Sequence, residues 1–148
     1  MKHLTLAAIL ILSGCVGSRT MELKIVSSIR ECPDPVKCRV KLADLTNFDW
    51  DRMYAFKYVA TKLDRELALG TKDQEFTELE RQIVFVKDGR IVFQESEATN
   101  VEHPIKNEVI FDIPDDATSK SYVHGVVFSA IEKRGEDGPY FLLKQVEP

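Results

Sequence analysis

Two aspartates that flank a tryptophan, and two histidines, are the residues whose types and spacing first suggest chemistry. Asp49 and Asp51 are placed for general acid–base work or Ca²⁺ binding, but the further oxygen ligands and the glycine of a calcium loop are missing. His103 lies in a polar loop and His124 in an expected strand, and neither has a ligand partner at metal-binding spacing. We therefore favour structural roles for these side chains.

Four consecutive residues form a candidate hub, which could serve interaction with a partner or the structure itself: Asp49, Trp50, Asp51 and Arg52. Its carboxylates can accept hydrogen bonds from backbone N–H groups at a corner of the chain. Asp51 can also form an ion pair with Arg52. An aromatic row of Trp50, Tyr54 and Phe56 could form a carbohydrate platform, but core packing is the favoured interpretation.

Other catalytic signals are missing from the sequence. Ser129 lacks the G-x-S-x-G context of a nucleophile elbow, and the glycines are isolated or in turns, so no phosphate-cradling loop is present. We predict no catalytic residues, no metal site and no cofactor, and a protein that is not an enzyme.

The N-terminal residues form an export signal. A basic start at Lys2 precedes an apolar run over residues 4–12, which is too short to span a bilayer. The run ends in Leu12-Ser13-Gly14-Cys15, which resembles the lipobox of bacterial lipoproteins. The resemblance implies cleavage after Gly14, a diacylglycerol on the Cys15 thiol and a third acyl chain on its amine. Two or more acyl chains anchor a protein stably.

This resemblance sets the expected domain organisation and location. Residues 1–14 are a removed signal peptide, residues 15–21 a lipidated tether, and residues 22–148 a single globular domain. Val16 follows the cysteine where an aspartate would favour the inner membrane. The protein is therefore expected in the outer membrane, facing the periplasm, if the host is Gram-negative.

With Cys15 assigned to lipid, Cys32 and Cys38 remain as a pair. An exported chain enters an oxidising compartment, where a disulfide persists. The alternatives are a metal pair or a redox centre, but a redox motif is usually C-x-x-C and a zinc site needs more ligands. We predict a structural disulfide.

Composition limits the class of protein. The 148 residues suit one compact domain, with 44% hydrophobic and 30% charged residues. The 20 basic and 24 acidic residues give a net charge of −4, which does not favour nucleic acid as a partner.

Hydrophobic periodicity predicts mostly β-structure. Thr61 and Asp64 have capping-box form before one short helix over residues 62–69, which we expect to pack Leu63 and Leu67 on a sheet. The Asp88-Gly89 turn indicates a β-hairpin. The expected strands comprise residues 23–29, 39–45, 48–58, 82–87, 90–94, 109–113, 122–131 and 139–146, with a corner at 49–51 and a strand from Arg52 as the alternative for the third.

These elements predict an α+β domain with about six to eight mostly antiparallel strands and one short helix, or a β-sandwich with a helical insertion. The segment from Phe48 to Phe56 has the pattern F-x-W-D-x-x-Y-x-F, and a capped helix and a V-F-V-K-D-G hairpin follow it. In this the chain resembles small bacterial proteins, often lipoproteins, for which we can name no activity. The resemblance implies a fold pattern and no catalytic residue.

Three functions remain open. The favoured one is a non-catalytic envelope lipoprotein that binds the membrane through its lipid and presents its domain to an envelope protein or to peptidoglycan. The second is an envelope hydrolase or small-ligand-binding lipoprotein that uses Asp49, Asp51, His103 or His124. The third is a structural spacer without a specific ligand.

Overall fold

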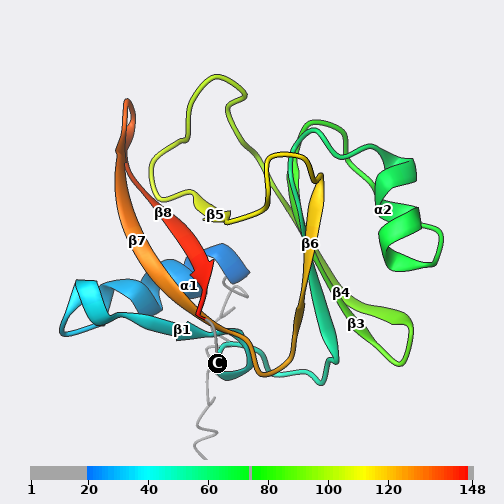
Figure 1. Cartoon of the computed structure of the whole chain (residues 1–148), viewed down its shortest axis with the longest axis horizontal. Helices are drawn as coiled ribbons and strands as arrows, with labels where there is room; N and C mark the ends of the chain where they lie inside the picture. Colours follow the sequence, from blue (N-terminus) through cyan, green and yellow to red (C-terminus); the bar gives the residue numbers. More distant parts are fainter. Residues whose placement is uncertain (1–19, 74, 147–148) are drawn as a thin grey trace, which may run out of the picture.

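The computed structural model describes residues 20–73 and 75–146 and has an α+β fold with a sandwich-like arrangement (Figure 1). Eight strands of these residues form two mostly antiparallel sheets, and two α-helices accompany them, which confirms the predicted fold class. Sheet A has the strand order β1-β7-β8-β5, and sheet B the order β4-β3-β2-β6. The elements are α1 (Met21–Arg30), β1 (Arg39–Lys41), β2 (Arg52–Phe56), α2 (Lys62–Leu69), β3 (Arg81–Lys87), β4 (Arg90–Glu97), β5 (Val109–Phe111), β6 (Ser119–Val123), β7 (Val127–Gly135) and β8 (Gly138–Gln145).

Helix α1 stands where the sequence predicted a strand over residues 23–29, so that prediction and the count of one helix were wrong. Thr20 caps the helix by accepting a hydrogen bond from the Leu23 amide. The buried residues include Met21, Ile25 and Ile29, which recur every four positions and so share one helical face. The β-branched residues suggested a strand, but their burial on one side of a helix outweighs their weak intrinsic preference.

Sheet B contains the predicted hairpin. Strands β3 and β4 pair through a turn in which Asp88 and Gly89 have φ values of 49° and 72°, as a type I′ turn requires. Strand β2 begins only at Arg52, so the corner alternative for residues 49–51 is the one that the structure contains.

Sheet A is built around the β7–β8 hairpin. Strand β5 pairs in parallel with β8, and β1 pairs with β7. The single strand predicted over residues 122–131 is divided, because β6 ends at Val123 in sheet B and β7 begins at Val127 in sheet A. The turn at His124 and Gly125 therefore moves the chain from one sheet to the other.

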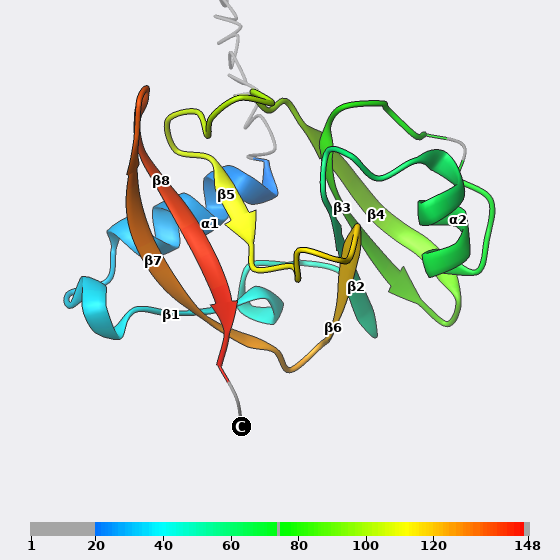
Figure 2. The same cartoon turned by 45° about the horizontal axis from the view of Figure 1, so that its top comes forward.

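Two apolar clusters stabilise this arrangement. The larger one lies between the sheets, includes Trp50, Phe85, Phe128 and Leu143, and also takes up the buried face of α1. The smaller one lies on the side of sheet B that faces away from sheet A, where α2 covers it (Figures 1 and 2).

Helix α2 has the predicted bounds, the predicted Thr61–Asp64 capping box and a left-handed Gly70 at its end. Its orientation differs from the prediction, since Leu63 and Leu67 are 64% and 73% exposed. The buried face instead carries Leu69 and Arg65, which is 1% exposed. Arg65 forms an ion pair with the buried Asp73.

Cys32 and Cys38 lie at disulfide-bonding distance, with their Sγ atoms 2.00 Å apart, as the sequence predicted. The pair connects the segment after α1 to the start of β1. The predicted signal peptide (1–14) and Cys15 lie outside the described residues. Among the residues that are described, no helix has the length and apolarity needed to cross a bilayer.

Candidate ligand cavity between the sheets

The predicted hub at residues 49–52 is a structural corner. The Asp51 carboxylate accepts hydrogen bonds from the Asp88 amide at 2.8 Å and from Lys87 Nζ at 2.7 Å. These contacts, the backbone amide first, lower the pKa of Asp51. Asp51 thereby fastens the β3–β4 turn to the corner, while Asp49 is exposed and Arg52 donates to Ser121 Oγ at 3.2 Å.

The predicted aromatic row does not form one surface. Trp50 is 2% exposed, donates from Nε1 to Thr46 Oγ1 at 3.0 Å, and packs edge-on against Phe85 in the inter-sheet core. Tyr54 and Phe56 belong to the other cluster, on the α2 side of sheet B. The corner before Arg52 breaks the alternation, so these rings pack in two cores and do not build a platform.

The two histidines lie in separate surroundings. His124 is exposed and packs beside Trp50 at 4.7 Å between ring centroids, and its backbone amide donates to the backbone carbonyl of Asp51. His103 has Glu136 and Asp137 carboxylate oxygens 3.7 and 3.6 Å from its ring nitrogens. Asp51 and His124 are thus neighbours at the surface, and His103 is not brought to them by any described contact.

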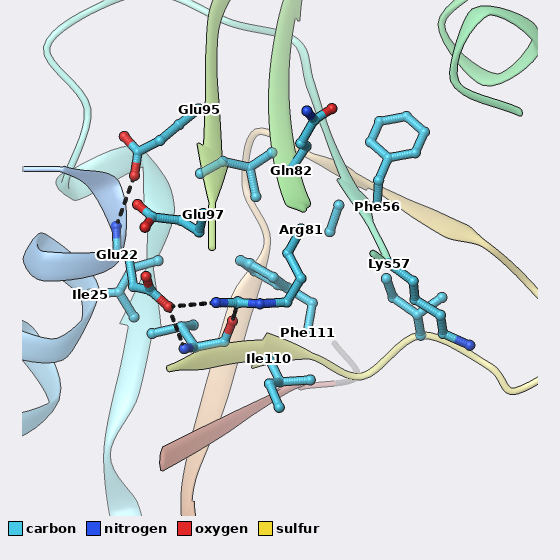
Figure 3. Close-up of a pocket in the computed structure, with 14 residues that line it drawn as sticks. Glu22, Ile25, Phe56, Lys57, Arg81, Gln82, Glu95, Glu97, Ile110 and Phe111 are labelled. Carbon is cyan, nitrogen blue, oxygen red and sulfur yellow. Dashed lines mark hydrogen bonds and ion pairs between the residues drawn. The ribbon is translucent and has the colours of Figure 1, made fainter. Parts of the chain in front are cut away.

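A cavity of about 60 Å³ lies between the two sheets beside the N-terminal end of α1 (Figure 3). Its lining comes from α1, from β2, β3 and β4 of sheet B, and from the segment that contains β5. Apolar residues dominate this lining: Ile25, Ala55, Phe56, Ile83, Val109, Ile110, Phe111 and Ile113.

Carboxylates form the polar wall of the cavity, and two of them lie at the start of α1. Glu95 on β4 accepts the Met21 backbone amide with its two oxygens, at 2.9 and 3.0 Å. Glu22, in the first turn of α1, accepts the Val109 amide at 2.6 Å. Anions are favoured near a helix N-terminus, so this placement stabilises the start of α1.

Arg81 is the cation of this wall, and its charge is already shared by two carboxylates. Its Nη2 atom lies 3.1 Å from Glu22 Oε1, and its Nε atom lies 2.6 Å from Glu108 Oε1. A further nitrogen donates to the Val109 carbonyl. Glu108 is 3% exposed and also accepts from Thr99 Oγ1 and the Ile105 amide, both at 2.8 Å.

Glu97 is the unbalanced member of the wall. Its Oε1 atom is buried and accepts no hydrogen bond within the described part of the chain. Burial, together with the neighbouring Glu95 and Glu22 carboxylates, raises the pKa of Glu97 to about 9. Glu97 therefore keeps its proton at neutral pH. Lys57, the other cation among the described lining residues, donates to the Pro114 carbonyl at 2.6 Å, and Figure 3 shows its ammonium directed away from the carboxylates.

The arrangement is chemically that of a binding site, with an apolar floor and a carboxyl-rich wall. Among the described residues that the sequence singled out, Phe56 of the aromatic row borders the cavity, although it also belongs to the cluster on the α2 side. The sequence contains one signal for this cavity. Glu95 and Glu97 are two residues apart, so in a strand they lie on the same face, and Arg81 lies opposite Glu97 in the register of the hairpin. The strand predicted in place of α1 hid the contribution of Glu22. No group of three metal-ligating side chains is arranged to hold a metal ion within residues 20–73 and 75–146.

Comparisons with protein-family models, with curated proteins and with solved structures found no match.

Proposed function

We propose that this chain is a bacterial envelope lipoprotein, held at the membrane by an acylated Cys15, whose β-rich domain is a non-catalytic binding module. The lipobox-like segment Leu12-Ser13-Gly14-Cys15 carries the proposal. The partner is an envelope protein or peptidoglycan. In a Gram-negative host the location is the outer membrane, facing the periplasm.

The position of α1 supports an anchored domain close to the bilayer. Only five residues separate Cys15 from Met21, where α1 begins. A fully extended chain covers about 3.5 Å per residue, so this tether reaches about 20 Å. The domain is then presented at the membrane surface, within reach of its other components.

The contacts of the polar candidates support a non-catalytic role. The Asp51 carboxylate is occupied by Lys87 and the Asp88 amide, and both of its oxygens serve the β3–β4 turn. The cavity, by contrast, favours a second function within the same class, the binding of a small ligand.

The anchor is tested by replacing Cys15 with serine in the full chain and fractionating the producing cells. The wild-type chain should be found with membranes and should incorporate labelled palmitate, whereas Cys15→Ser should be released and unlabelled. The matched control is Cys32→Ala with Cys38→Ala, which removes the other cysteines and should keep both properties. Membrane association that is unchanged in Cys15→Ser would contradict lipidation.

The binding role is tested by crosslinking in living cells. Purification of the crosslinked chain should return one discrete partner, an envelope protein or a peptidoglycan fragment, in repeated preparations. Recovery of none over several growth conditions would favour a structural spacer.

A further inference from the structure

We propose that the inter-sheet cavity binds a primary alkylammonium group on a short aliphatic chain, as in a lysine side chain of an envelope protein or an amine-bearing residue of a peptidoglycan peptide. This inference rests on the proposed binding function and names the chemistry of the ligand.

Charge complementarity is the first argument. Among the described residues, four carboxyl groups line or border the cavity: Glu22, Glu95, Glu97 and Glu108. The Arg81 guanidinium pairs with two of them, Glu22 and Glu108. The partial positive charge of the α1 N-terminus, equivalent to about half an elementary charge, compensates only part of the excess at Glu95. The site balances the rest by keeping Glu97 protonated, and a ligand ammonium that replaces this proton would bring the missing positive charge.

The lack of an N–H donor to Glu97 is the second argument. Within the described residues no amide or cation donates to its buried Oε1 atom, and its neighbours are the Glu95 and Glu22 carboxylates, which can share only the single Glu97 proton. An ammonium group offers three donors to the same carboxylates. Glu95 keeps its bonds to the Met21 amide, so an ammonium placed between Glu95 and Glu97 need not displace the start of α1.

Size and polarity are the third argument. A cavity needs about 10–15 Å³ to hold each water-sized group, so about 60 Å³ accommodates about four to six such groups. The chain from Cβ to Nζ of lysine has that length. Ile25, Ile83 and Phe111 would contact its methylene groups, and the ammonium would lie at the carboxyl wall.

The direct test is a titration of the full chain carrying Cys15→Ser, which needs no detergent. Binding is monitored by the NMR chemical shifts of the Ile25 and Ile83 methyl groups. The probe is n-butylammonium, and the matched probe without charge is n-butanol. Saturable shifts with n-butylammonium, and binding at least tenfold weaker for n-butanol, are expected. Equal binding of both probes, or no saturable shift with n-butylammonium, would overturn the proposal.

A variant locates the charge. Glu97→Gln preserves the shape of the side chain and should weaken n-butylammonium binding at least tenfold. Glu102→Gln, an exposed change that is not part of the lining, should leave binding unchanged. Circular dichroism and the unfolding midpoint verify that both variants fold. Binding by folded Glu97→Gln at the wild-type affinity would refute the site.

The pH profile is a further readout. Within the described part of the chain, the charged groups that face the cavity or border it are Glu22, Glu95, Glu97, Glu108, Arg81 and Lys57. Since the ligand ammonium competes with the Glu97 proton, affinity should rise with pH toward 9 and then fall as the amine itself, with a pKa of about 10, loses its proton. An affinity that does not change between pH 6 and 9 would contradict this competition.

The two sources of the amine are separated by comparing Nα-acetyl-lysine methylamide with a purified peptidoglycan peptide that carries a free amine. The one that binds more tightly than n-butylammonium identifies the source. The Cys15→Ser fractionation does not depend on the cavity, so failure of this inference and failure of the anchor are distinguishable.

Discussion

Replacing Asp73 with asparagine should strongly destabilise the domain, because it leaves the Arg65 guanidinium buried without a counter-charge. The side chains of Arg65 and Asp73 are 1% and 0% exposed. Burial lowers the pKa of Arg65, and the charge of Asp73 opposes that effect. The guanidinium also lies over two rings, 5.1 Å from the centroid of Phe56 and 5.5 Å from that of Phe76.

The expected magnitude follows from this burial. Removing one partner of a buried pair costs about 3–5 kcal/mol. A domain of this size has a free energy of unfolding of roughly 5–15 kcal/mol, so Asp73→Asn should remove about a fifth or more of it. At about 4 °C per kcal/mol, the melting temperature should fall by about 12–20 °C.

A double-mutant cycle measured by urea unfolding is the assay. Arg65→Met alone should also destabilise the domain, because it leaves the Asp73 carboxylate buried and unpaired. Arg65→Met with Asp73→Asn should return to within about 1 kcal/mol of the wild type, since methionine packs well on aromatic rings and no charge remains buried. Additive losses in the double variant, or a loss below about 1 kcal/mol in Asp73→Asn, would refute the buried ion pair as the organiser of α2.

Three further predictions concern the bridge, the cavity wall and the corner. Reduction of Cys32–Cys38 should lower the free energy of unfolding by about 2 kcal/mol, the value that the chain-entropy model gives for so short a loop. The measurement is the urea midpoint with and without reductant. Rapid thiol labelling of the unreduced chain would contradict the bridge. Because folding raises the pKa of Glu97 from 4.5 to about 9, the folded state holds a proton that the unfolded state releases, so this group's contribution to stability is lost as pH rises from about 4.5 to 9. Glu97→Gln should flatten that decline in urea titrations at pH 5, 7 and 9, and parallel profiles would argue against it. Asp51→Ala should speed hydrogen exchange at the Asp88 amide, because it removes the acceptor of that amide, while Asp49→Ala should not. Equal exchange rates in the two variants would show that Asp51 does not hold the β3–β4 turn.

Local signals explain the parts of the fold that the sequence predicted well. The Asp88-Gly89 turn needs positive φ at two positions, and the Thr61–Asp64 box with Gly70 bounds α2 by contacts within the segment itself. The disulfide pairing followed from the count of cysteines. Each of these depends on residues that are close in the chain, so the pattern alone contains the information.

The parts that were predicted wrongly depend on distant contacts. Residues 23–29 are rich in β-branched side chains, and only the burial of Ile25 and Ile29 against both sheets makes them helical. The orientation of α2, in which Arg65 is buried, depends on its ion pair with Asp73, which lies outside the helix. Likewise, the cavity requires Glu22 of α1 to meet Arg81 of β3, and no local spacing shows this.

Mass spectrometry of the mature N-terminus, on the chain isolated from the producing cells, tests the central claim most directly. The mature chain should begin at Cys15 and carry a diacylglyceryl group on its thiol and an acyl chain on its amine. An unmodified chain that begins at Met1 would contradict it, and the proposed anchor and location would be wrong.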